Sequence, residues 1–557
     1  MIFHRPGGKR FSRVLAVLGS TVFLGACSSG GESPSQASSA VSSQEASQVA
    51  AATNPSPDPQ IASQWHLGAT ADSFSYDLAI GKQSERGRGI TLALIDGTVD
   101  AKHPDLQGQL LAGSQVCCDW AAVTSPAGSS DPSAPAMGLG PMSDLGHATG
   151  LAALIAANES NGIGGRGIAP ASRLLSLNAI AIGNDSRLVQ AMKVAIGSGA
   201  AVINNSWSPP DPGQGGSRSF YQAPAGWYEA LDEAQTLGRG GLGAIVVKAV
   251  GNGGASLSPS RLAGDSGDQA NYDGFAQHPL IISVAAVDAA ARPLASSEPG
   301  AQVLVSAFSS QTNTPVVSTG TEALPEGSST AAAMVSAVSA LMLEAQPRLS
   351  WRDLRWILAS TARPIPGYDQ AGVSSAVSSL REHGFHQKIG FGLIDAGAAI
   401  LMAKGFAGLP AAKRCTYDAQ QTPPMASSSG LNPGEALSWQ QLSIEERSGT
   451  VSFSFDLPLG TCPVERIESL LLSIATSHQD ASGLRLTLVS PAGRGVQFTA
   501  PRDCNQPPCT NLSRGFQFHT VRFMAEAAYG SWTLQIREES GKSVGQLSEL
   551  RLNVIGH

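Results

Sequence analysis

The chain has 557 residues, enough for several domains, and carries a formal net charge of −7 with only 14% charged residues. This sparse, slightly acidic charge argues against nucleic-acid binding, which needs concentrated Lys and Arg. The 62 glycines and the many serines are typical of a secreted enzyme rich in loops.

The first 26 residues are typical of a secretory signal peptide. Arg5, Lys9, Arg10 and Arg13 form a positive end, and residues 14–24 form an apolar run that is too short to span a bilayer. We therefore expect an exported protein.

The apolar run ends in Leu24-Gly25-Ala26-Cys27, which resembles a bacterial lipoprotein cleavage box. The resemblance implies cleavage before Cys27, acylation of its thiol and attachment to a membrane of the bacterial envelope. Ser28 in the next position favours the outer membrane over the inner one. An ordinary signal peptide followed by a chance cysteine is the alternative.

The cysteine count fits this interpretation. Seven cysteines are odd for an exported protein, but a lipid on Cys27 leaves an even set: Cys117, Cys118, Cys415, Cys462, Cys504 and Cys509. Export makes disulfides possible, and we expect one bridge between Cys504 and Cys509 and another between Cys415 and Cys462. The adjacent Cys117 and Cys118 would form a strained ring or stay reduced, and the connectivity is open from sequence alone.

Residues 27–57 are rich in Ser, Ala, Gln and Pro, which predicts a flexible tether. In the following region, 58–408, short apolar runs alternate with helical patterns. This alternation predicts an α/β domain, a mostly parallel sheet covered by helices on both faces. The expected strands are 90–95, 174–179, 201–205, 244–250 and 280–286, and the expected helices are 189–196, 230–237 and 331–345.

The pattern changes near residues 409–413. Beyond it, many runs alternate apolar with polar residues and are separated by Gly, Pro, Asp or Ser, which predicts an all-β sandwich over 415–557. The expected strands are 451–457, 464–475, 484–489, 496–499, 519–524, 532–536 and 550–555.

Three separated residues supply the parts of a nucleophilic triad. Asp96 ends an apolar strand, His147 precedes an apolar helical pattern, and Ser329 precedes an Ala-rich run. A serine hydroxyl needs a base in contact, and that base needs an acid to fix its tautomer. The order Asp, His, Ser is that of subtilisin. We expect His147 and Ser329 each to stand at the start of a helix.

A fourth segment, Gly251-Asn252-Gly253-Gly254, follows the strand 244–250. The Asn252 amide and the Ser329 N–H could together stabilise an oxyanion. Each residue alone has a simpler explanation: Asp96 could cap a turn, His147 could be an ordinary helix residue, and Asn252 could occupy a tight turn. Their joint occurrence in one order favours catalysis.

From about residue 58 to 405 the chain resembles subtilisin-like serine endopeptidases, and specifically their kexin and furin branch. The motifs that carry the resemblance are Asn205-Ser206-Trp207-Ser208-Pro209-Pro210-Asp211, Val250-Gly251-Asn252-Gly253-Gly254 and Asp268-Gln269-Ala270-Asn271-Tyr272-Asp273-Gly274. The region 415–557 resembles the jelly-roll-like P domain, also called Homo B, of that branch through Ser490-Pro491-Ala492-Gly493 and Gly530-Ser531-Trp532-Thr533-Leu534.

The resemblance implies a substrate site. Asp211 and Asp273 match carboxylates that receive a basic side chain before the scissile bond, and a fixed opposite charge suits Arg or Lys. Asp144 matches a carboxylate of the next subsite. Gly97 replaces a second aspartate of kexin-like enzymes, so cleavage after a single basic residue is as open as a dibasic requirement. Ser206, Trp207 and Ser208 would bind an extended peptide by strand addition.

The resemblance also implies calcium, which suits oxygen ligands from distant loops. Asp58, Asp105 and Asn161 match side-chain ligands of one site, to which carbonyls of Asn158, Ile163 and Gly165 would add. Asp211, Asp268 and Glu298 match a second site. Solvated loop aspartates are the alternative.

Some positions depart from the family pattern: Ser328, Ala333 and Ala148 replace the usual Thr, Pro and Gly, and residues 28–57 are too short for a folding-assistant propeptide. The rival to a calcium-dependent, monomeric, lipid-anchored endopeptidase is therefore a non-catalytic surface protein that uses the same scaffold for binding or adhesion.

Overall fold

The structure is a computed structural model. It describes residues 56–68, 77–80, 83–112, 114, 141–180, 185–210, 220–254, 267–309, 324, 327–368, 384–428, 443–444, 450–478, 480–501, 511–539 and 545–557, apart from the side chains of 141–145, 428, 443 and 511. Residues 1–54 and 55–557 are separate units, and the description below concerns the second.

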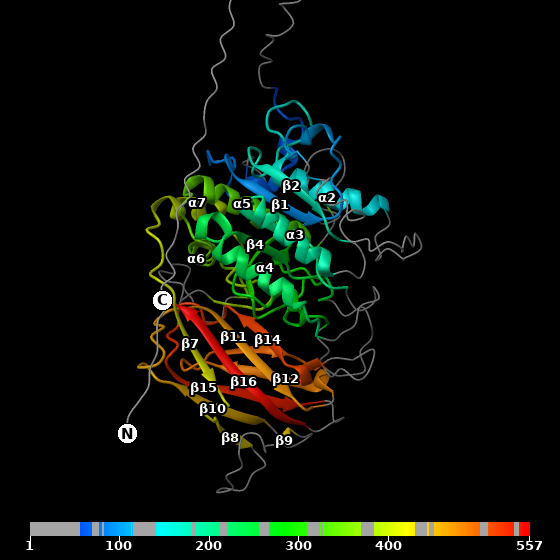
Figure 1. Cartoon of the computed structure of the whole chain (residues 1–557). Helices are drawn as coiled ribbons and strands as arrows, with labels where there is room; N and C mark the ends of the chain where they lie inside the picture. Colours follow the sequence, from blue (N-terminus) through cyan, green and yellow to red (C-terminus); the bar gives the residue numbers. More distant parts are fainter. Residues whose placement is uncertain are drawn as a thin grey trace, which may run out of the picture. The chain divides into compact units, whose positions relative to one another are not determined.

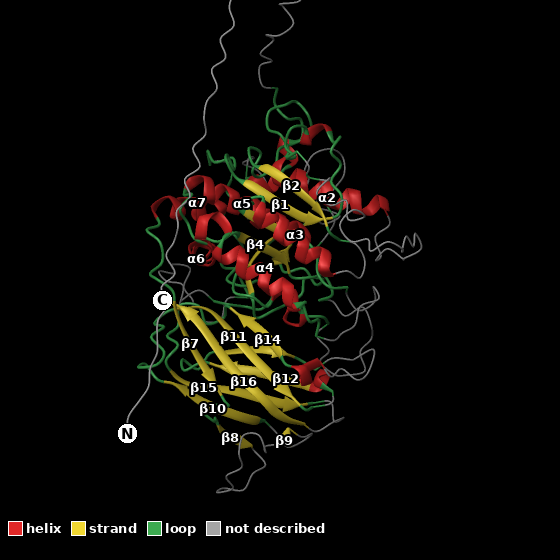
Figure 2. Ribbon diagram, viewed as in Figure 1, coloured by secondary structure: helices red, strands yellow, loops and turns green. Residues whose placement is uncertain are grey.

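A six-stranded parallel sheet lies at the centre of the first half of this unit (Figures 1 and 2). Its order is β2-β1-β3-β4-β5-β6, and nearly every residue of the inner strands is buried, as expected for a sheet covered on both faces. The strands are β1 (Thr91–Asp96), β2 (Arg173–Asn178), β3 (Val202–Asn205), β4 (Ile245–Ala249), β5 (Ile281–Val287) and β6 (Val303–Phe308). The predicted α/β class is confirmed.

Six α-helices accompany this sheet in the described part of the chain: α2 (Pro141–Ala156), α3 (Asp185–Gly197), α4 (Ala225–Thr236), α5 (Ser328–Ala345), α6 (Trp351–Thr361) and α7 (Ala396–Gly405). The helix α5 packs on β3, β4, β5 and β6 and is almost wholly buried. It is long and apolar enough to cross a membrane, but 89% of that window is inside the fold, so its apolarity is that of a core helix. The strand β6 and the helices α6 and α7 were not predicted from the sequence.

The second half consists of two antiparallel sheets with a shared apolar core that includes Phe453, Leu470, Leu534 and Leu552. One sheet has the order β13-β12-β15-β10-β8, and the other has β14-β11-β16-β7 with β9 paired to β16. Their strands are β7 (Lys413–Asp418), β8 (Met425–Ser428), β9 (Ser443–Ile444), β10 (Val451–Leu457), β11 (Ile467–Thr476), β12 (Leu484–Val489), β13 (Gly495–Thr499), β14 (Phe516–Thr520), β15 (Gly530–Glu538) and β16 (Gly545–Gly556). This arrangement is the predicted all-β sandwich.

The strand predicted over 519–524 is wrong in its second half. The strand β14 ends at Thr520, and the chain then turns, with Ala525 at a φ of 66°. The reason is that Val521 donates its N–H to the carbonyl of Ala301 instead of to a neighbouring strand. Val521 and Ala525 thereby join the core of the first half.

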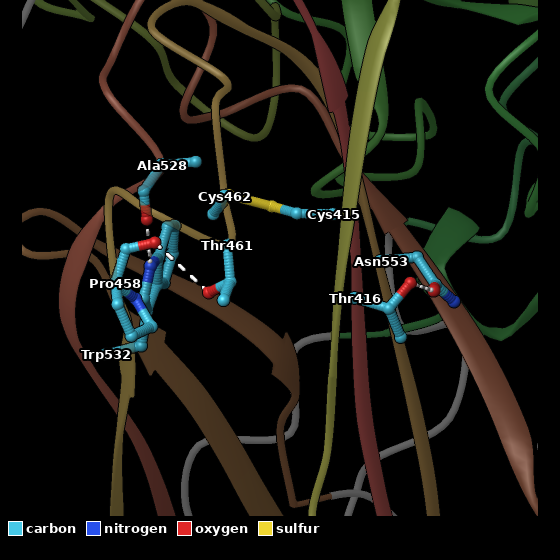
Figure 3. The surroundings of a disulfide bond; sticks show 8 residues. All are labelled: Cys415, Thr416, Pro458, Thr461, Cys462, Ala528, Trp532 and Asn553. Atoms are coloured by element: carbon cyan, nitrogen blue, oxygen red, sulfur yellow. Dashed lines mark hydrogen bonds between the residues drawn. A yellow bond between two sulfur atoms is a disulfide. The ribbon is translucent and has the colours of Figure 1, made fainter.

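A disulfide joins Cys415 on β7 to Cys462, which follows β10 (Figure 3). The Cα atoms are 5.0 Å apart, and the bond spans 47 residues of sequence. Beside it, the Trp532 indole donates to the carbonyl of Ala528 over 2.8 Å. The bond ties the first strand of one sheet to the loop that follows a strand of the other.

Candidate active site

The polar residues singled out from the sequence gather at the carboxyl ends of neighbouring parallel strands. Asp96 is the last residue of β1, Ser206 directly follows β3, and Asn252 follows β4 by three residues. In the sheet order β3 lies between β1 and β4, so these ends meet at one edge. Such an edge is where open α/β sheets bind ligands.

Asp96 and His147 form a hydrogen-bonded pair. Oδ1 of Asp96 lies 2.8 Å from Nδ1 of His147 and also accepts the N–H of Gly97 over 2.7 Å. Asp96 is 1% exposed, and its second oxygen has no hydrogen-bond partner among the described residues. A buried carboxylate on Nδ1 fixes the imidazole with Nε2 as the basic nitrogen.

The position of His147 differs from the expected one. The helix α2 begins at Pro141, so His147 stands in its second turn and not at its start. The N–H groups near His147 are therefore not the free donors of a helix N-terminus, and the geometry of the imidazole depends on the Asp96 contact.

Ser329 is the second residue of α5 and is half-buried, whereas Ser328 is fully buried. The Ser329 hydroxyl donates to the carbonyl of Ser206 over 3.0 Å, and the Ser206 hydroxyl donates to the carbonyl of Ser329 over 2.9 Å. A hydroxyl has one proton, so that proton must turn from Ser206 toward His147 before Ser329 can attack a carbonyl.

Asn252 lies directly against the start of α5. Its Oδ1 accepts the N–H of Ser328 over 2.8 Å and the Ser328 hydroxyl over 3.1 Å. The side-chain oxygen is thus occupied, and the amide nitrogen is the end that can donate to an oxyanion. Gly327 allows this approach: it has a φ of 141°, and a Cβ there would lie 2.8 Å from Oδ1 of Asn252.

The residues expected to bind the substrate are only partly described. Ser206 is buried, and Trp207 and Ser208 are half-buried at the exit of β3. Asp211 lies outside the described residues, and of Asp144 the structure describes only its place in α2.

Asp273, the other carboxylate expected to receive a basic substrate side chain, already has a cationic partner. Its Oδ2 lies 2.9 Å from Nζ of Lys248, and its Oδ1 accepts the N–H of Phe275 over 2.8 Å. Burial raises the pKa of the Asp273 carboxyl, and the charge and hydrogen bond of Lys248 oppose that rise. The sequence reasoning missed Lys248, although a lysine within the apolar run 244–250 signals a buried charge that needs a counter-ion.

Most residues of the first expected calcium site come together. Asp58 accepts the N–H groups of Ser160, Asn161 and Gly162 over 2.8–3.2 Å. The Asn161 amide donates to Oδ1 of Asp105 over 2.7 Å. Gln60, near Asp58, donates its N–H to the carbonyl of Gly164. The segment around Asp58 is therefore attached to the loop after α2.

The donor set of this site fits a cation. Burial, and after it the nearby Asp58 carboxylate, raise the pKa of Asp105 to about 6, while the Asn161 hydrogen bond opposes the rise. The buried Oδ2 of Asp105 has no hydrogen-bond partner among the described residues. Two carboxylates, an amide and backbone carbonyls suit Ca²⁺, but Oδ1 of Asn161 accepts the N–H of Ile163 over 2.9 Å, so this amide would have to turn to bind the ion. The described residues contain no group of three or more His, Cys, Asp or Glu side chains that could hold a metal ion, so such a site would rely on the amide and the carbonyls.

Of the second expected calcium site, Asp268 and Glu298 lie beside the loop that carries Asn252, and Asp211 is outside the described residues. Glu298 is buried and accepts the N–H of Gly253 over 3.0 Å, and the N–H of Asp268 donates to the carbonyl of Gly253. Two residues expected to add carbonyls to the first site are Asn158 and Ile163. The Asn158 side chain donates its N–H to the carbonyl of Gln107 and accepts the amide N–H of Gln109. Ile163 is 41% exposed. Cys27, Cys117, Cys118, Cys504 and Cys509 lie outside the described residues.

Residues 87–392, more than half of the chain, match the family model described as the subtilase family, peptidase S8, and the chain therefore belongs to the subtilase family. Residues 467–554 match the model described as the proprotein convertase P-domain. The combination of the two domains agrees with the resemblance inferred from the sequence motifs.

Furin of Bos taurus is 25% identical over 511 residues, covering 90% of this chain and 58% of furin. The dibasic-processing endoprotease of Schizosaccharomyces pombe is 28% identical over 496 residues, covering 87% of this chain and 63% of that protein. The chain thus spans less than two thirds of the length of these relatives. A serine protease of Aeromonas sobria, 21% identical, has the same fold with a TM-score of 0.68, over 90% of this chain and 96% of that one.

Proposed function

We propose that this protein is a serine endopeptidase that hydrolyses peptide bonds of protein substrates. The observation that carries the proposal is the arrangement of a buried Asp96 on His147 and of Asn252 against the start of α5, one residue from Ser329. Membership of the subtilase family supports it. The Asn252 contact adds support, because it occupies the side-chain oxygen and leaves the amide nitrogen as the end that can donate to an oxyanion.

In this mechanism the Ser329 hydroxyl attacks the substrate carbonyl while Nε2 of His147 takes its proton. Asp96 holds the imidazole and stabilises the charged form that develops. The amide nitrogen of Asn252 and the backbone N–H of Ser329 donate to the oxyanion, where the first turn of α5 supplies N–H groups without intrahelical acceptors. His147 then gives the proton to the leaving amine as the C–N bond breaks, and a water deprotonated by His147 hydrolyses the acyl ester on Ser329.

A preference for Arg or Lys before the scissile bond stays a prediction. It is supported by the name of the fission-yeast relative, a dibasic-processing endoprotease. Asp211 would carry most of it, because Asp273 already has Lys248 as a partner. Profiling a peptide library tests it: enrichment of large apolar residues before the cut would remove the assignment of Asp211 and Asp273.

We include the binding of two calcium ions in the proposed function. Asp58, Asp105 and Asn161 would hold one ion, and Asp268, Glu298 and Asp211 a second. The first ion would supply positive charge between two carboxylates and so fix the segment around Asp58 to the domain.

We also propose export and lipid attachment through Cys27. The Cys415–Cys462 disulfide supports export, since such bonds persist in oxidising compartments. Metabolic labelling with a clickable fatty acid, compared between the native chain and Cys27→Ala, tests the attachment; equal labelling of both would contradict it.

The central test of the enzyme proposal is labelling with a fluorophosphonate probe in the presence of calcium. We expect the native chain to be labelled and Ser329→Ala to be unlabelled, with its peptide cleavage reduced roughly 10⁴-fold or more. Ser328→Ala is the matched control, since Ser328 is buried and bonded to Gly251 and Asn252, and we expect it to retain labelling. An unlabelled native chain that cleaves no library peptide would favour the non-catalytic surface protein instead.

A further inference from the structure

Lys248 is a fully buried lysine in the middle of β4, with 0% of its side chain exposed. Its ammonium lies 2.9 Å from Oδ2 of Asp273 and donates to the carbonyl of Trp207 over 2.6 Å. It also lies 4.3 Å from the centre of the Trp207 ring, a cation–π distance. A buried ammonium is stable only when it is paired and hydrogen-bonded, and Lys248 meets this condition with two residues of the active-site region.

These contacts place the pair beside the reaction centre. Trp207 directly follows Ser206, whose carbonyl accepts the Ser329 hydroxyl. Lys248 itself stands four residues before Asn252 on the same segment. The two backbone segments that Lys248 connects, the exit of β3 and the exit of β4, are thus those that carry the contact to the nucleophile and the oxyanion donor.

We propose that Lys248 is a specificity-determining residue of this peptidase. Its ammonium occupies Asp273, so the carboxylate does not serve a basic substrate side chain, and selection for Arg or Lys before the scissile bond is weakened in the native chain. Removing the charge of Lys248 unmasks that selection. The inference rests on the proposed function, because it concerns the same site.

The reason is electrostatic competition for one carboxylate. Asp273 is 5% exposed, so water screens its charge only weakly. Two cations held at this one carboxylate would repel each other. Without Lys248 the buried carboxylate would lack a counter-charge, and a guanidinium or ammonium from the substrate would be the available replacement. A neutral side chain gains nothing from the same change.

The experiment compares two fluorogenic peptides that differ only in arginine or citrulline, its neutral analogue, before the scissile bond. The readout is the ratio of kcat/KM for the two peptides. We expect Lys248→Met to raise this ratio about tenfold over the native chain, the size of one charge-assisted hydrogen bond. Lys248→Gln, which keeps a donor for the Trp207 carbonyl, gives the same direction if the methionine variant folds poorly.

Two controls separate this mechanism from others. Lys193→Met removes a half-exposed lysine that pairs with Glu233 on the surface, and we expect it to leave the ratio unchanged. The double variant Lys248→Met with Asp273→Asn contains neither charge, and we expect its ratio to return to the native value. A raised ratio that survives in the double variant, or an active Lys248→Met with an unchanged ratio, would overturn the inference.

A binding measurement keeps the inference separate from the enzyme proposal. In the Ser329→Ala background, fluorescence titration with p-aminobenzamidine should show about tenfold tighter binding to the Lys248→Met chain. If the native chain is inert to fluorophosphonate and to both peptides, the proposed function fails while this titration still decides about Lys248. Equal affinity of both chains for p-aminobenzamidine would refute the role of Lys248.

Discussion

Nδ1 of His147 lies 2.8 Å from Oδ1 of Asp96, and this carboxylate, 1% exposed at the end of β1, also accepts the N–H of Gly97. The Gly97 N–H orients the carboxylate. The carboxylate in turn holds the imidazole in the tautomer that carries its proton on Nδ1. The contact joins the sheet to α2, two elements that are far apart in sequence.

Asp96→Asn should therefore lower kcat by about 10⁴-fold with little change in KM, because an amide at this position favours the wrong tautomer of His147. Steady-state kinetics on a library-derived peptide measure both constants. The fluorophosphonate label on Ser329 should form much more slowly but should still form. A loss confined to KM would show that Asp96 acts on substrate binding and not on His147.

Gly327→Ala should lower kcat by about 10²- to 10³-fold, the loss expected when an oxyanion donor is removed. The added Cβ would lie 2.8 Å from the Asn252 side chain and would displace it. Asn252→Ala should have an effect of the same size, and the two changes together should cost little more than either alone.

Gly408→Ala is the matched control for Gly327→Ala. Gly408 also has a positive φ, 94°, but a Cβ there would meet nothing within 4 Å. It should lower the melting temperature slightly through backbone strain and leave kcat unchanged. Equal losses of kcat in both glycine variants would point to general destabilisation.

Removal of calcium should lower the melting temperature, because Asp58 and Asp105 would then face each other without a counter-ion. An ion present at 100 times its dissociation constant adds about 2.7 kcal/mol to the free energy of unfolding. Scanning fluorimetry across a calcium titration measures the shift, and Asp58→Asn should abolish most of it. Equal melting temperatures with chelator and with millimolar calcium would contradict this site.

Acid should destabilise the protein through His66. This side chain is fully buried, and desolvation, assisted by the charge of Arg166, lowers the pKa of His66 to about 3 from its usual 6.5. Between these values the unfolded state binds a proton that the folded state does not, so stability falls as the pH drops below 6.5. The loss amounts to about 3 kcal/mol by pH 4.

His66→Phe tests this, because phenylalanine fills a similar volume without a titrating group. The variant should show a flatter dependence of the midpoint for urea unfolding on pH between 4 and 6.5. Parallel curves for the native chain and the variant would assign the acid sensitivity to other groups.

The sequence predicted five of the six parallel strands because continuous apolar runs mark buried strands clearly. The strand β6 was not predicted, although Val303–Phe308 is equally apolar. The helix α6 was not predicted either, although its capping box of Ser350 and Asp353 is a signal that the sequence contains. Residues of the candidate site were found by motif and order, since each stands at the end of a strand or near the start of a helix. The start of α2 was misplaced because His147 was taken for its first residue.

The state of Asp273 could not be predicted in the same way. Lys248 lies in β4, and the periodicity of a strand buried on both faces does not tell which neighbour an inward lysine meets. Only the tertiary arrangement brings its ammonium to a carboxylate 25 positions later in the chain. Motif matching singled out Asp273 and gave no information about its partner.

The contacts of Gln277 limit how the β-rich half, residues 415–557, can be exchanged with that of a relative. Its amide nitrogen donates to the carbonyl of Asp273, and its oxygen accepts the N–H of His519 on β14. One side chain therefore connects the segment that carries Asp273 to the β-rich half. A chimera that replaces residues 415–557 by the corresponding region of a relative would alter the support of Asp273 unless the backbone donor at position 519 is reproduced. The β-rich half therefore contributes to the support of Asp273 and is not freely exchangeable.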